Sequence, residues 1–162
     1  MSEKHKNLVR RWFQELDKEK GPVTELCTPG YIGHHPGVPP MDLITHRQYS
    51  SGFFDAVPDL QHVIEDTIVD GDKVGCRVAN RGTHTGGELM GMAPTGKTID
   101  VSAIVIFRIE DEKGAEVWGV FDRMGMLEQI GAGAAPRRAA GRDRAACACG
   151  AVSYTHLRAH EP

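Results

Sequence analysis

Residues 78–121 decide the fold predicted for this chain. They begin VANRGTHTG (78–86), continue GELMGMAPTGK (87–97), and close with VWGVF (117–121). The outer parts have strand-like composition, and the Gly- and Pro-rich segment between them predicts a turn. His84 therefore lies where one strand ends, a place from which a polar ring commonly faces a cavity.

The strand pattern extends on both sides of this stretch. Strands are predicted at roughly 60–70, 73–84, 98–109 and 115–122, with turns at 70–72 and 111–114. Val74, Cys76 and Val78 alternate with their neighbours, so this strand has an inner face, which Asn80 and His84 continue.

Helical patterns precede the strands. Apolar residues at positions 8, 9, 12, 13 and 16 form one stripe of a helix over residues 3–20. A short second helix is expected from Gly21-Pro22 to 28–30, followed by an extended segment over 31–36. Thr45 fits a capping box that opens a third helix before Pro58, and a last helical turn is expected over 124–130. Helices followed by antiparallel strands predict an α+β fold, with a curved sheet wrapped against three N-terminal helices.

Composition predicts one globular domain over residues 1–131, followed by a basic tail over 132–162. The domain carries 14 Lys/Arg against 20 Asp/Glu, a balance of −6, which disfavours nucleic-acid binding. The tail lacks apolar periodicity and is expected to be disordered, and residues 152–160 resemble a translated sequencing adapter. No membrane span or signal peptide is apparent, so a cytoplasmic protein is expected.

The four cysteines do not form a convincing metal pattern. Cys147 and Cys149 are a lone pair, whereas structural zinc usually needs two such pairs or spaced histidines. Cys27 and Cys76 are expected to be small core residues.

The chemistry available consists of isolated polar residues on apolar strands. No phosphate loop, dinucleotide fingerprint, zinc-protease motif or serine elbow occurs. This pattern suits acid/base chemistry on a bound apolar molecule, without a cofactor. His34, His84 and Asp122 are the candidate catalytic residues.

Alternatives remain open for each candidate. His84 is equally compatible with a core histidine that bonds a backbone carbonyl, and Asp122 with the cap of the last helix. His34 and its neighbour His35 face opposite ways on an extended segment, so only one of them can enter a pocket. A metal site built from His34, His84 and Asp122 has no supporting spacing.

Several apolar and aromatic residues are candidate ligand contacts, although core packing is the commoner use of helical aromatic spacing. In the last strand, Trp118 shares a face with Asp122, and Gly119 shares the other face with Phe121. His46 and His62 are expected at the surface. The candidate substrate-binding residues are Trp118, Tyr31, Asn80, Trp12 and Phe53.

Four segments together resemble the SnoaL-like polyketide cyclases, also called ester cyclases. They are RGTHTG (81–86), LMGMAPTGK (89–97), IFRIED (106–111) and residues 118–131, and the likeness covers residues 4–131. The resemblance implies the cone-shaped α+β barrel of the nuclear transport factor 2 superfamily, with a deep apolar pocket. It also implies ring closure by intramolecular aldol condensation without metal or organic cofactor, using an aspartate in the last strand.

The chain departs from this family at that aspartate. Alignment on the closing motif places Gly119 at the catalytic position, whereas Asp122, His84 and His34 match other family positions. The missing carboxylate is expected to leave a larger, less polar cavity. Two hypotheses therefore stand: an enzyme of the cyclase, isomerase or dehydratase kind acting on a hydrophobic carbonyl compound, or a non-catalytic ligand-binding or dimerisation module.

The resemblance, together with apolar residues on both faces of 99–107, also predicts a homodimer formed through the outer face of the sheet.

Overall fold

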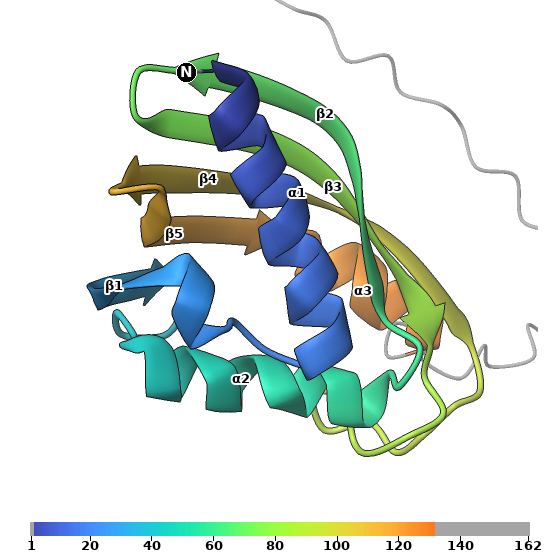
Figure 1. The fold of residues 1–162 in the computed structure, drawn as a ribbon. Coiled ribbons are helices and arrows are strands. Elements are labelled where there is room, and N and C mark those ends of the chain that lie inside the picture. The colour runs from blue at the N-terminus through green and yellow to red at the C-terminus, as the bar shows by residue number, and fades with distance from the viewer. Residues whose placement is uncertain (1, 132–162) are drawn as a thin grey trace, which may run out of the picture.

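The computed structural model describes residues 2–131, and its fold is α+β as predicted (Figure 1). The elements in chain order are α1 (Ser2–Glu19), the 3-10 helix η1 (Thr24–Leu26), β1 (Cys27–His34), α2 (Leu43–Ala56), β2 (Gln61–Asp70), β3 (Lys73–Thr83), β4 (Thr98–Glu110), β5 (Lys113–Phe121) and α3 (Arg123–Ile130).

The five strands form one open, curved sheet in the order β1-β5-β4-β3-β2. β1 runs parallel to β5, and all other neighbours are antiparallel. Asp111 and Glu112 join β4 to β5 with positive φ values of 48° and 58°, the left-handed pair that a tight hairpin requires. Figure 1 shows α1 crossing the inner face of the sheet, with α2 beside the β1 edge.

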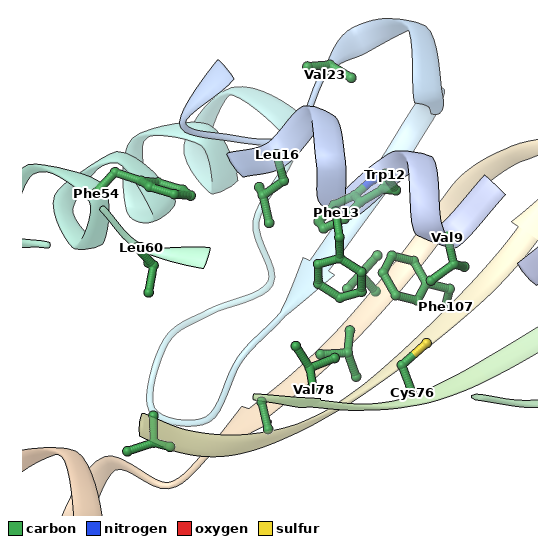
Figure 2. Packing of buried hydrophobic residues seen from close by; sticks show 14 of the residues in the cluster. Val9, Trp12, Phe13, Leu16, Val23, Phe54, Leu60, Cys76, Val78 and Phe107 are labelled. Carbon is green, nitrogen blue, oxygen red and sulfur yellow. The ribbon is translucent and has the colours of Figure 1, made fainter. Parts of the chain in front are cut away.

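The apolar stripe of α1 packs onto this inner face. Val9, Trp12, Phe13 and Leu16 are all buried. Figure 2 shows these side chains directed toward the strands, where the ring of Trp12 meets Phe107 edge-on with centroids 5.0 Å apart. Each such side chain contributes about 1.5–3 kcal/mol by leaving water. The predicted helix and its buried face are confirmed.

Two predicted helix boundaries were wrong. The short second helix is only the 3-10 turn η1, and residues 28–30 belong to β1, where they lie in a break of the register between the pairs formed by Cys27 and Ile32 with β5. The third helix is capped by Asp42, whose carboxylate accepts from the backbone N–H of Thr45 at 2.8 Å. Met41 bridges to Gly33, so the chain stays extended up to Asp42 and turns into the helix there.

The cysteines of the described residues are core residues, as expected. Cys27 and Cys76 are buried free thiols, and burial raises the pKa of each to about 11. Cys147, Cys149 and the tail expected to be disordered lie outside the described residues.

Candidate functional site

A cavity of about 110 Å³ lies between the inner face of the sheet and helices α1 and α2. One ordered water needs only ~10–15 Å³, so the cavity is large enough for an organic ligand. Its wall is mostly aliphatic and aromatic, which is typical of small-molecule sites. The polar residues on the wall are His35, His46, Tyr49, Ser50, His62 and Asn80.

Three of the surrounding polar side chains form a hydrogen-bonded row at the β1 edge of the cavity. The hydroxyl of Tyr31 lies 2.6 Å from Nδ1 of His46. Nε2 of His46 lies 3.0 Å from Nε2 of His35. Tyr31 is buried behind the cavity wall, whereas His46 and His35 line it. The row therefore leads from the protein interior to the ligand space.

Two glycines make room for this row. A Cβ on Gly33 would lie 2.7 Å from Nδ1 of His46, and a Cβ on Gly119 would lie 2.7 Å from Cε1 of His35. Real Cβ atoms essentially never approach other atoms so closely. Each imidazole thus occupies space that a side chain on the neighbouring strand would take. The expected enlargement of the cavity at Gly119 was wrong, because the His35 ring fills that space.

Burial keeps the row neutral. It raises the pKa of Tyr31 far above its usual value, so the hydroxyl stays protonated. Burial, reinforced by His35, lowers the pKa of His46 to about 3. Burial also lowers the pKa of His35. A hydrogen bond with the Gly119 backbone opposes that shift, and the electrostatic effect of nearby His34 adds to it. At pH 7 both imidazoles are uncharged.

The proton positions can be assigned from the hydrogen-bond pattern. Tyr31 has no other partner among the described residues, so its hydroxyl donates to Nδ1 of His46. Nε2–H of His46 then donates to Nε2 of His35. His35 therefore carries its own proton on Nδ1, a buried nitrogen that faces the backbone of Gly119. The row therefore ends in an N–H beside Gly119, a residue of the cavity wall.

Three of the predicted ligand contacts line the cavity. Trp12 of α1, Phe53 of α2 and Asn80 of β3 all contribute to its wall. Tyr31 lies behind the wall, in contact with His46. Trp118 lies on the opposite face of the sheet, because Val117, Gly119 and Phe121 are the β5 residues that point inward.

The three predicted catalytic residues are not brought together. His34 stacks on Trp118 on the outer face, with ring centroids 5.1 Å apart. His84 is fully buried outside the cavity lining, with Nδ1 3.2 Å from Thr95 Oγ1 and Nε2 3.0 Å from the carbonyl of Gly87. Asp122 is exposed and caps α3, accepting from the N–H of Gly125 at 2.8 Å.

Two histidines expected at the surface are not there. His46 is only 3% exposed, and His62 is hydrogen-bonded to Asp17 on the cavity wall. The periodicity of α2 could not reveal His46, since a single histidine near a helix start has no partner in sequence. The one available signal was the alternation of Tyr31 and Gly33 along β1, which continues to His35 just after the strand and puts it on the buried face.

Neither a metal centre nor a membrane helix is found in residues 2–131. No group of three or more His, Cys, Asp or Glu side chains there is arranged to hold a metal ion. No helix in the same residues has the length and apolar character needed to cross a bilayer.

Comparison with known proteins gives a consistent family. IdmH from Streptomyces antibioticus, a candidate polyketide cyclase, is 25% identical with a TM-score of 0.71, over 78% of this chain and 98% of that chain. AclR from Streptomyces galilaeus, a candidate hydroxylase, has the same TM-score at 22% identity, over 79% of this chain and 96% of that chain. No curated protein sequence matches. The model of the SnoaL-like polyketide cyclases matches residues 7–130, and the chain therefore belongs to that family.

Proposed function

We propose that the protein performs acid/base chemistry of the cyclase type on a hydrophobic carbonyl compound bound in the cavity. In this proposal, His35 is the catalytic residue, and His46 and Tyr31 are positioning residues. The observation that carries the proposal is the neutral, hydrogen-bonded row that ends at Nδ1 of His35, beside Gly119 on the cavity wall. Membership of the cyclase family supports the reaction class.

His35 stands where the family resemblance implies a carboxylate. A side chain on Gly119 would begin 3.0 Å from Nδ1 of His35. The imidazole therefore offers a titratable group at the same part of the wall, although it comes from the end of β1 and not from β5. A carboxylate there would act as a base, whereas a neutral imidazole with a proton on Nδ1 acts first as a donor.

The proposed step uses this donor to stabilise an enolate. The Nδ1–H of His35 donates to the ligand's carbonyl oxygen, which lowers the pKa of the adjacent C–H. A base in the cavity, such as water, removes that proton, and the carbanion attacks a second carbonyl carbon of the same molecule. The proton returns to the new alkoxide, so the reaction is an isomerisation overall. Loss of one such donor typically costs about 10²–10³ in rate.

The remaining predicted catalytic residues keep structural roles in this proposal. His84 joins the ends of the segment after β3, because its backbone N–H donates to Lys97 and its carbonyl accepts from Gly96. Asp122 begins α3. Both would therefore change stability more than turnover when replaced.

The test is hydrogen–deuterium exchange at the α-carbon of a hydrophobic cyclic β-keto ester, followed by NMR in D₂O. Wild type should accelerate exchange, and His35→Ala should reduce the acceleration by about 10²–10³. His34→Ala is the matched control, because the adjacent ring lies on the outer face of the sheet.

Exchange that survives His35→Ala, or that is lost equally in His34→Ala, would refute the assignment. Binding of the ester without any accelerated exchange in wild type would favour a non-catalytic ligand-binding module.

We also propose that the protein forms a homodimer through the outer face of the sheet. Ile68, Ile104 and Val120 are 71%, 52% and 56% exposed there. Ile104 lies opposite Val120, and Ile106 lies opposite Trp118, so these residues form one apolar patch. Light scattering should give twice the monomer mass, and Ile104→Lys should give the monomer. A monomer in the wild type would refute the proposal.

A reducing compartment such as the cytoplasm is the proposed location. Two buried free thiols, Cys27 and Cys76, support it, because disulfides are rare in such compartments. Detection of the protein in a secreted fraction would refute this location.

A further inference from the structure

A second polar group lies on the part of the cavity wall formed by β2 and β3. His62 of β2 places Nδ1 2.5 Å from one carboxylate oxygen of Asp17, and its backbone N–H donates to the other at 2.9 Å. The ring also stacks on Phe13, with centroids 5.6 Å apart. An ionised carboxylate accepts only, so Nδ1 is the protonated nitrogen that bonds Asp17, and Nε2 takes no part in that pair. No described residue bonds that Nε2.

Asn80 is the cross-strand neighbour of His62. The two residues are paired in the register of β2 and β3, and both line the cavity. The side-chain oxygen of Asn80 is buried and has no hydrogen-bond partner among residues 2–131. Buried polar atoms in folded proteins nearly always have a partner, so an unpaired one at a cavity wall indicates where a ligand atom binds.

This pair is separated from His35 across the sheet. β1 and β2 are the two edge strands, and β5 and β4 lie between β1 and β3. Three strand spacings of ~4.8 Å make about 14 Å along the curved sheet. The wall between the two polar ends is apolar, with Val101, Val105 and Val117. A ligand that reaches both ends needs a polar group at each and an apolar body.

We propose that His62 and Asn80 form a second polar subsite, which binds a phenolic or enolic hydroxyl of the ligand whose carbonyl lies at His35. The second half of this statement rests on the proposed function. The hydroxyl donates its one proton either to Nε2 of His62 or to Oδ1 of Asn80, and its oxygen accepts from the other side chain. A carbonyl oxygen cannot donate to the unpaired Oδ1 of Asn80. A carboxylate is disfavoured by the nearby charge of Asp17.

The test compares two probes of nearly equal size, 2-naphthol and 2-methoxynaphthalene, by fluorescence titration of the full chain. Only the first can donate a hydrogen bond. Wild type should bind 2-naphthol about tenfold more tightly, which corresponds to about 1.4 kcal/mol. His62→Phe and Asn80→Leu should each bring the ratio of dissociation constants close to one. Asn80→Leu leaves the Asp17–His62 pair intact, so it tests the subsite even if His62→Phe fails to fold.

His35→Ala separates this inference from the proposed function, because it should reduce the acceleration of α-carbon exchange by about 10²–10³ and keep the preference for 2-naphthol. Equal binding of the two probes by wild type would overturn the subsite. So would a preference that survives Asn80→Leu, or one that disappears in His35→Ala.

Discussion

Replacing Gly119 by alanine should destabilise the protein through His35 alone. The added Cβ would lie 2.7 Å from Cε1 and 3.0 Å from Nδ1 of that ring. Ordinary van der Waals contact begins at 3.4 Å, so the ring must move away from β5. Moving it stretches the 3.0 Å hydrogen bond to His46.

The expected cost follows from these two effects. Loss of a neutral hydrogen bond costs about 1 kcal/mol, and an off-rotamer ring about 0.5–1.5 kcal/mol. The sum falls within the ~1–3 kcal/mol typical of overpacking a buried site. Opposing it, alanine in a strand is favoured over glycine by roughly 0.5–1 kcal/mol. A net loss of about 0.5–2 kcal/mol is therefore expected.

The assay is a double-mutant cycle in urea, with Gly119→Ala measured in wild type and in His35→Ala. Without the ring, the new methyl group meets no obstacle, so the substitution should become neutral or slightly stabilising. The coupling energy should thus be about 1–3 kcal/mol. Gly30→Ala is the matched control, because Gly30 also lies in a strand and a Cβ there meets no atom within 4 Å.

An equal cost of Gly119→Ala in both backgrounds would refute this reasoning, since the clash would then not involve His35. A stable Gly119→Ala protein with full α-carbon exchange would also contradict the proposed position of the donor.

Three further predictions concern the same side of the molecule. Gly33→Ala should lower the free energy of unfolding by about 1–3 kcal/mol, measured by chemical denaturation, because the new Cβ would displace the ring of His46. The NMR signals of His46 should shift as well, and unchanged signals would contradict this prediction. The pKa of His46 is about 3 in the folded state and ~6.5 in the unfolded chain, so the unfolded chain takes up a proton at a higher pH. The free energy of unfolding should therefore be highest above about pH 6.5 and fall by up to ~1.4 kcal/mol per pH unit toward pH 3. His46→Gln should make that slope shallower in urea titrations, and an unaltered slope would exclude His46 as its source. Asp42→Ala should cost about 1 kcal/mol by removing the cap of α2, whereas Thr45→Ala should cost less; the reverse order in thermal melts would reassign the cap.

Local sequence patterns predicted most of the fold because they record which face of each element is buried. The stripe containing Trp12 and Phe13 follows the helical period, and the alternation of Val74, Cys76 and Val78 follows the strand period. Both periods depend on backbone geometry alone. The family resemblance then implied the cone-shaped arrangement of these elements around an apolar pocket. The second helix was mispredicted because β1 begins at Cys27, where the chain pairs with β5, and this leaves only the turn η1 before it.

The cavity lining was predicted where it follows the same periodicity. Trp12, Phe53 and Asn80 lie on inward faces and do contact the cavity. The inward face of β5 was decided by tertiary structure, since parity separates Trp118 from Gly119 without indicating which of them points inward.

The polar row was decided only by the tertiary structure. Tyr31, His35, His46 and Gly119 come from β1, its end, α2 and β5, and no spacing along the chain relates them. They meet because the parallel pairing of β1 with β5 brings α2 over both strands, and because two glycines leave room for two imidazoles. A missing side chain has no sequence signal of its own. What fills its place depends on which ring the fold brings there.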